Sequence, residues 1–270
     1  MLIRVGFSAD PDDAFMFWGL ASGTVDARGY EFEPVIEGIQ TLNEWSLEGR
    51  LEVTAMSAAT YPLVCDRYVL LPHGASIGSG YGPIVVAREQ LSFDELRGIE
   101  IVIPGELTTA FLVLKMALGA DVSHRVMPFD AILPEVVSGR ARAGLLIHEG
   151  QLTYRDEGLA KCLDLGEWWL LETGLPLPLG VNTARRDIGE KALREVSAIL
   201  RESIGAALEH RDEALEYALG FGRGMDAERG DAFIGMYVNE LTQDYGEEGR
   251  EAIRELLTRS WPDVRLEWVQ

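Results

Sequence analysis

Residues 144–150, GLLIHEG, form a short apolar run that ends at His148. A polar side chain at the end of a buried strand costs free energy unless it is paired. Histidine is the side chain that most readily gains or loses a proton near neutral pH. His148 is therefore a candidate acid or base. The same spacing also fits an ordinary polar residue at the edge of a core, and spacing alone does not separate the two interpretations.

Two threonines occupy a second position where chemistry is possible. Thr108 and Thr109 stand in IPGELTTA, between an apolar strand pattern and an amphipathic helix pattern. The backbone N–H groups of a first helical turn suit a carboxylate or phosphate oxygen. These threonines are candidate substrate contacts, and the alternative is that they only cap the helix.

Further polar residues follow the predicted strands of the N-terminal region. Ser8, Asp10 and Asp12 come after the first strand in SADPDDAF, Ser57 ends the third strand, and Ser79 lies in GSGYG after the fourth. Serine and aspartate also serve as helix caps, and glycine-rich segments form tight turns. We expect these five residues to contact a substrate if their strands end at one place.

The order of predicted strands and helices indicates that these strands end at one place. Apolar alternation typical of strands repeatedly precedes helical periodicity. Such alternation predicts an α/β fold with mixed, mostly parallel sheets and helices on both faces. The pattern occurs in two runs, which predicts two lobes, and two strands look like crossings between them. Strands are expected at 2–8, 30–37, 51–58, 68–75, 83–89, 98–105, 123–130, 141–150 and 177–185.

This layout is that of a two-lobe periplasmic-binding-protein type II-like fold. We expect residues 1–88 and 178–270 to form a large discontinuous lobe and residues 89–177 a small one. In open α/β sheets, ligands bind beyond the carboxyl ends of strands. The candidate residues are therefore predicted to face a cleft between the lobes.

The composition of the chain excludes some classes of binding partner. The chain of 270 residues has 47% apolar residues and a net charge of −20, which argues against nucleic acid and anionic membranes. It has no signal-peptide pattern and no membrane-length apolar run, so we expect a cytoplasmic protein. We expect its partner to be a small-molecule substrate and the protein to be a monomer or homodimer. Cys65 and Cys162 are expected to be reduced thiols. No metal-ligand spacing, dinucleotide fingerprint or phosphate-loop lysine is present, so no metal or cofactor is expected.

Several long segments of the chain resemble, in the same order, those of a known enzyme family. The chain resembles the 1,4-dihydroxy-6-naphthoate synthase family of the futalosine route to menaquinone, from about residue 3 to residue 255. The segments that carry it are AGLLIHEGQLTY, DLGEWWLLETGLPLPLG, FEPVIEGIQTLNEWSLEGRLEVTAMS, GYGPIVVAR, IPGELTTAFLVL and YVNELTQDYGEEGREAI.

The resemblance implies a carbon–carbon lyase that converts cyclic dehypoxanthine futalosine to 1,4-dihydroxy-6-naphthoate without a cofactor or metal. It also implies His148 as the catalytic base, with Thr108, Thr109 and Ser57 as substrate contacts. The chain departs from the family pattern in three places. Asp10, Asp12 and Ala14 stand where cysteine, asparagine and threonine are common, Ser79 stands where arginine is common, and SAATY replaces a stretch that usually contains histidine. An ionised Asp12 only accepts hydrogen bonds, so we expect weaker binding of an anionic substrate if that side chain faces it.

Two other functions fit the same fold. One is a sibling enzyme similar to the chorismate dehydratase of the same route, against which the segments IHE and TGLPLPLG argue. The other is a cytoplasmic binding protein for a small anionic ligand that lacks the lyase activity. The altered SADPDDAF turn is the feature that favours it.

Overall fold

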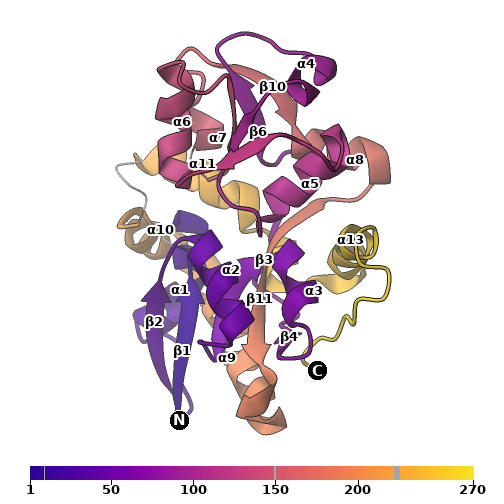
Figure 1. Ribbon diagram of the computed structural model, residues 1–270. Helices are drawn as coiled ribbons and strands as arrows, with labels where there is room; N and C mark the ends of the chain where they lie inside the picture. The colour runs from indigo at the N-terminus through magenta and orange to yellow at the C-terminus, as the bar shows by residue number, and fades with distance from the viewer. Residues whose placement is uncertain (9, 149, 222–225) are drawn as a thin grey trace. The chain divides into compact units, whose positions relative to one another are not determined.

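A computed structural model describes residues 1–8, 10–148, 150–221 and 226–270 (Figure 1). The chain forms two compact units. The first contains Met1–Ile77 and Pro178–Gln270, and the second contains Gly78–Leu177. Residues 78–88, which the sequence pattern assigned to the large lobe, fall in the second unit, because the strand Ile84–Ala87 pairs there with two other strands.

The first unit is built on one mixed sheet. Its strand order is β2-β1-β3-β11-β4, and β5 pairs with β11. β1 runs parallel to β2 and β3, whereas β11 runs antiparallel to β3 and β4. The strands are β1 (Leu2–Phe7), β2 (Glu31–Ile36), β3 (Val53–Ser57), β4 (Tyr68–Leu70), β5 (Ser76–Gly78) and β11 (Leu177–Arg185).

Alternation along β1 explains how the sheet is covered. Ile3, Val5 and Phe7 are buried in one apolar core with residues of the helices on that face. Gly6 points the other way, and a Cβ there would lie 2.9 Å from the Leu42 side chain. Because successive strand residues face opposite sides, the two faces pack against different helices.

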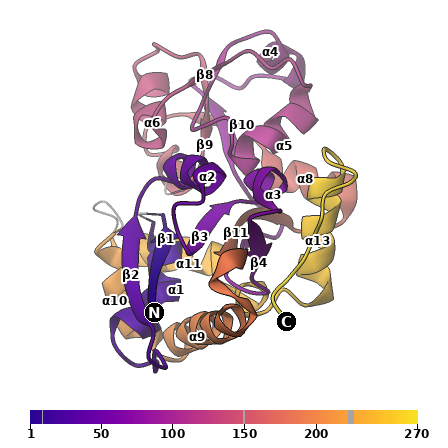
Figure 2. The same ribbon diagram turned by 60° about the horizontal axis from the view of Figure 1, so that its bottom comes forward.

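The helices of the first unit follow from their patterns and termini. Gly49 adopts a left-handed conformation (φ 71°) and ends α2, a position that glycine fills readily because it has no side chain. α1 packs most extensively on α9 and α10, and Figure 2 shows α9 along the sheet face opposite α2 and α3. The helices are α1 (Pro11–Ala21), α2 (Ile39–Glu48), α3 (Tyr61–Val64), α9 (Glu190–Glu209), α10 (Arg211–Leu219), α11 (Ala227–Tyr237), α12 (Glu240–Gln243) and α13 (Gly246–Thr258).

The second unit has its own mixed sheet in the order β10-β6-β9-β7-β8. β7 is parallel to β8 and β9, while β6 is antiparallel to β9 and β10. Its elements are β6 (Ile84–Ala87), α4 (Phe93–Arg97), β7 (Ile101–Ile103), α5 (Thr109–Leu118), β8 (His124–Val126), α6 (Phe129–Val137), β9 (Ala143–Leu146), α7 (Gly150–Thr153), β10 (Ala160–Asp164) and α8 (Leu165–Thr173).

Two differences from the sequence expectation have physical causes. Of the eight strand pairings whose direction is given above, four are antiparallel, since β6 and β11 run back against their neighbours. The strand β10 and the helix α8 were also not anticipated. Asp164 ends β10 and caps α8 by accepting hydrogen bonds from the N–H groups of Gly166 and Glu167, so one aspartate marks both boundaries.

Candidate functional site

A turn rich in carboxyl groups follows β1 in the first unit. Ser8 donates from its backbone N–H and its hydroxyl to Asp13 Oδ2, at 2.7 and 2.8 Å. Asp10 occupies the N-cap position of α1 with extended backbone, and its carbonyl accepts from Ala14 N–H. Ser8 is therefore held by the first turn of the helix, and Asp10 stands at the N-cap position without a capping hydrogen bond from its side chain.

Burial makes this turn chemically unusual. Three aspartates in this turn are almost fully buried: Asp10 is 1% exposed, and Asp12 and Asp13 are each 7% exposed. Ser76 donates its hydroxyl hydrogen to Asp12 Oδ2 at 3.1 Å. Burial, together with the charges of Asp13 and Asp10, raises the pKa of Asp12 well above its ordinary value. A neutral carboxyl group keeps one O–H donor, so Asp12 can donate a hydrogen bond as an asparagine amide does.

Ser57 lies at the carboxyl end of β3, where the sequence places it. Its backbone N–H donates to Asn43 Oδ1 at 2.8 Å, and Asn43 Nδ2 donates to Ser57 Oγ at 3.0 Å. Both residues are buried. Asn43 comes from the buried face of α2, and it was not among the predicted residues because an asparagine within a helix pattern carries no signal for a partner 14 residues away.

The candidate residues Thr108 and Thr109 lie at the amino end of α5 in the second unit. Thr108 caps the helix: its Oγ1 accepts from Phe111 N–H at 3.2 Å and donates to Gly105 O at 2.8 Å. Thr108 and Thr109 are both buried. The capping interpretation of Thr108 is thus confirmed, and its hydroxyl positions a helix terminus whose N–H groups and dipole favour an anionic oxygen.

His148 follows β9 and stands in a backbone conformation that few residues adopt. Its φ is 57°, in the left-handed region, which is uncommon for a residue with a side chain. Its carbonyl accepts from Gln151 N–H at 3.1 Å, at the start of α7. The imidazole lies edge-on to Phe129, with 4.6 Å between ring centroids, and is half-buried. Such strained positions cluster at functional sites.

Ser79 differs from the other candidates. It lies in the second unit, at an exposed turn after β5. The other candidates are buried or half-buried at strand ends, in two groups: Ser8, Asp10, Asp12 and Ser57 in the first unit, and Thr108, Thr109 and His148 in the second. Two further residues were not predicted from the sequence. Ser76 contacts Asp12 and Phe129 contacts His148, and in each pair the two residues come from separate segments of the chain.

The described residues contain no group of three or more histidine, cysteine or carboxylate side chains arranged to hold a metal ion. Cys65 and Cys162 are both free thiols. No helix among the residues that the structure covers is long and apolar enough to cross a membrane.

Two mixed sheets whose strand ends carry buried polar groups define the class: an α/β protein with a periplasmic-binding-protein-like fold. A solved structure of the alkanesulfonate-binding protein from Xanthomonas axonopodis supports this fold, with a TM-score of 0.67 at 10% identity over 87% of this chain and 84% of that one. A family model described as menaquinone biosynthesis matches residues 3–260. The chain belongs to this menaquinone-biosynthesis family.

Two relatives are much more similar in sequence. The 1,4-dihydroxy-6-naphthoate synthase of Thermus thermophilus is 43% identical over 258 residues, which cover 96% of this chain and 93% of that protein. A crystal structure of a protein from Archaeoglobus fulgidus is 46% identical, with a TM-score of 0.91 over 97% of this chain and 98% of that one. The protein is therefore an enzyme of menaquinone biosynthesis.

Proposed function

We propose that the protein is a carbon–carbon lyase of the 1,4-dihydroxy-6-naphthoate synthase type. Its substrate is cyclic dehypoxanthine futalosine, it works in the cytoplasm, and it needs neither metal nor cofactor. The name of the Thermus thermophilus relative supports the reaction. The observation that carries the assignment of the base is the position of His148, at the end of β9 with strained backbone and an aromatic neighbour.

In the proposed reaction, His148 removes a proton from a substrate hydroxyl, and the electron pair left on that oxygen forms a carbonyl as the neighbouring carbon–carbon bond breaks. The electron pair of the broken bond stays on the ring that becomes aromatic, and the fragment that carries the new carbonyl leaves. A group whose pKa lies near the working pH is suited to this step. Phe129 fixes the imidazole by an edge-on contact, which limits the ring orientations available for proton transfer.

The remaining candidates bind the substrate in this proposal. The amino end of α5, set by the Thr108 cap, receives an anionic oxygen of the substrate beside Thr109. Ser8, Asp10, Ser57 and Ser79 offer polar contacts. Asp12 in its neutral form donates a hydrogen bond, so its replacement of the family's asparagine keeps a donor at that position.

The test uses purified protein and cyclic dehypoxanthine futalosine, with 1,4-dihydroxy-6-naphthoate followed by absorbance and mass. The informative substitution is His148→Asn, because asparagine tolerates left-handed backbone but cannot act as a base. Loss of a general base is expected to slow turnover by about 10²–10⁴-fold. His210→Asn, at an exposed position, is the matched control.

Turnover that survives His148→Asn would remove His148 from the role of base. A second candidate function, a binding protein that lacks catalysis, is favoured by the buried acidic turn in place of the family's sequence. Saturable binding without any turnover by the unmodified protein would establish that alternative.

A further inference from the structure

A surface hollow of about 740 Å³ lies in the first unit, apart from the candidate substrate-binding residues. Its walls are the end of α2 (residues 47–49), residues from 63–67 after the start of α3, and the turn after β11 (185–187). In the β3–β11 ladder, Ala184 pairs with Val53 and Gly180 with Ser57. The hollow therefore lies at the amino end of β3, on the order of 13 Å along the strand from Ser57. We call it the Arg67 hollow.

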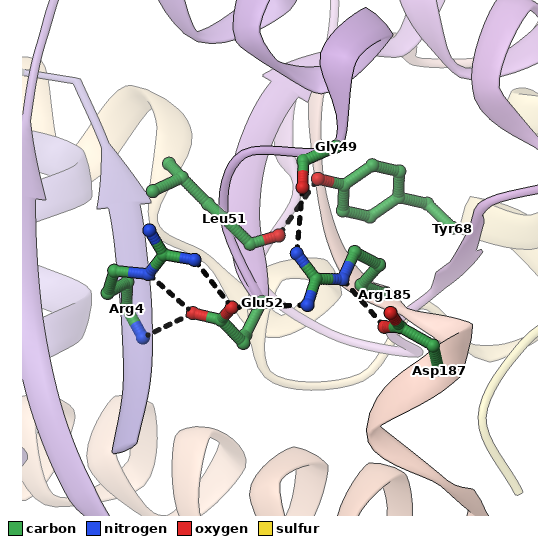
Figure 3. Close-up of polar contacts among 7 residues, drawn as sticks. All are labelled: Arg4, Gly49, Leu51, Glu52, Tyr68, Arg185 and Asp187. Carbon is green, nitrogen blue, oxygen red and sulfur yellow. Dashed lines mark hydrogen bonds and ion pairs between the residues drawn. The ribbon is translucent and has the colours of Figure 1, made fainter.

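A network of ion pairs holds the wall formed by Arg185 (Figure 3). Arg185 donates to Asp187 Oδ1 at 2.6 Å and to Gly49 O at 2.7 Å, and its Nη2 lies 3.3 Å from Glu52 Oε1. Since Gly49 ends α2 and Asp187 follows β11, these bonds fix two walls of the hollow to each other.

The carboxylates that line the hollow are already paired with arginines. Glu48 binds Arg50 at 2.5 Å, Asp187 binds Arg185, and Asp66 lies 3.5 Å from Arg265. A carboxylate that is paired repels a second anion less than a free one does. The acidic lining therefore leaves an anion-binding position open.

Arg67 supplies the cation for that position. Among the residues that the structure describes, it forms no ion pair, and its hydrogen bond goes from Nη1 to the carbonyl of Leu47. Its Nε and Nη2 donate to no described residue. A guanidinium edge with free donors matches the two oxygens of a carboxylate. A charge of this kind is conspicuous in a chain with a net charge of −20.

Apolar side chains flank this guanidinium. Leu47 and Leu63 line the hollow and are 40% and 51% exposed, although both are large and hydrophobic. A ligand that covered them would remove apolar surface from water, which stabilises binding. The combination of a free guanidinium, exposed leucines and a volume typical of ligand sites selects a molecule with one carboxylate on an apolar body.

We propose that the Arg67 hollow binds a small aromatic monocarboxylate, with its carboxylate on Arg67 and its ring against Leu47 and Leu63. The product 1,4-dihydroxy-6-naphthoate belongs to this class, so the hollow is a second site for the enzyme's own product. That last identification rests on the proposed function, whereas binding of an aromatic monocarboxylate does not.

The experiment follows the methyl NMR signals of Leu47, Leu63 and Val64 in the full-length protein while 2-naphthoate is added. Saturable shifts of these signals are expected, and uncharged 2-naphthamide should produce much weaker ones. Arg67→Gln is expected to weaken 2-naphthoate binding at these signals by roughly ten- to a hundredfold, the range for losing a charge-assisted hydrogen-bonded contact. Arg194→Gln makes the same charge change on α9, where the arginine is exposed and lies 3.7 Å from Glu190, and should leave binding unchanged.

Leu63→Asp is a second variant, since this exposed position makes no hydrogen bond that the fold requires and the new carboxylate repels the ligand. It should also abolish the shifts. Unshifted methyl signals in the unmodified protein, or unaltered binding in both variants, would overturn the proposal. Turnover measured in the same samples separates the two hypotheses: an inactive protein that still binds 2-naphthoate here contradicts the proposed function alone.

Discussion

Buried carboxyl groups lie near both ends of β3, and the one at the amino end is paired with arginines. At its carboxyl end, the neighbouring turn after β1 buries Asp10, Asp12 and Asp13 together. At its amino end, Glu52 is also buried but accepts from Arg4 N, Nε and Nη2 at 3.0, 2.9 and 2.7 Å (Figure 3). A paired carboxylate stays ionised, whereas a buried one beside other carboxylates favours the neutral form.

The pKa values of the two ends show this difference. Burial pushes the pKa of Glu52 upward, but the hydrogen bonds and charge of Arg4 and the charge of Arg185 outweigh it, and the result lies below the ordinary value. Burial and the charges of Asp13 and Asp10 act together on Asp12 and raise its pKa. The amino end therefore holds the sheet together with ion pairs, while burial at the carboxyl end favours the neutral form of Asp12.

The largest effect on stability is expected from Glu52→Ala. This change leaves Arg4 and Arg185 without their shared carboxylate and should lower the free energy of unfolding by about 2–3 kcal/mol, less than for a fully buried pair because both arginines are partly exposed. Urea unfolding measures it. Glu48→Ala is the control, since its exposed pair with Arg50 should contribute below about 1 kcal/mol. Equal losses in both variants would contradict the structural role assigned to the amino end.

The buried His73 is a third case, in which burial outweighs the opposite charge of Asp244. Its Nε2 lies 3.0 Å from Ser197 Oγ, its Nδ1 has no hydrogen-bond partner among the described residues, and burial lowers its pKa to about 4. The unfolded chain binds this proton near pH 6.5, so stability falls as the pH drops from 6.5 towards 4. We expect a loss of about 2 kcal/mol between pH 7.5 and pH 5.

Unfolding of the unmodified protein and of His73→Gln across this pH range tests that expectation. The variant should show a flatter dependence of stability on pH, whereas His210→Gln, at an exposed position, should follow the unmodified protein. An unchanged slope in His73→Gln would show that another group is responsible.

The smallest effect is expected at the carboxyl end. Because the folded-state pKa of Asp12 is raised, its contribution to stability is present at low pH and is lost as the pH rises through that pKa. Asp12→Asn should therefore stabilise the protein more at pH 8 than at pH 5. Thermal or urea unfolding at the two pH values gives the difference, and equal gains would mean that the protonation of Asp12 in the fold does not change between them.

Much of the local structure could be predicted from the sequence because it depends on neighbouring residues. The alternation in β1 and the Gly49 stop of α2 are local signals, and both appear in the structure. α8 was not predicted, since its sequence LGEWWLLET is apolar on most sides and shows little helical periodicity. Strand direction was only partly predictable, because a strand pattern does not say which neighbour it will join.

Patterns along the chain were enough to place most of the strands and helices and the candidates at their ends, including Thr108 and His148. The charge environment of these candidates depends on the tertiary structure. Asp12 meets Ser76 across 64 residues, and Arg4 meets Glu52 across 48. Whether a carboxyl group holds a proton depends on burial and on partners from distant strands, and no spacing along the chain contains that information.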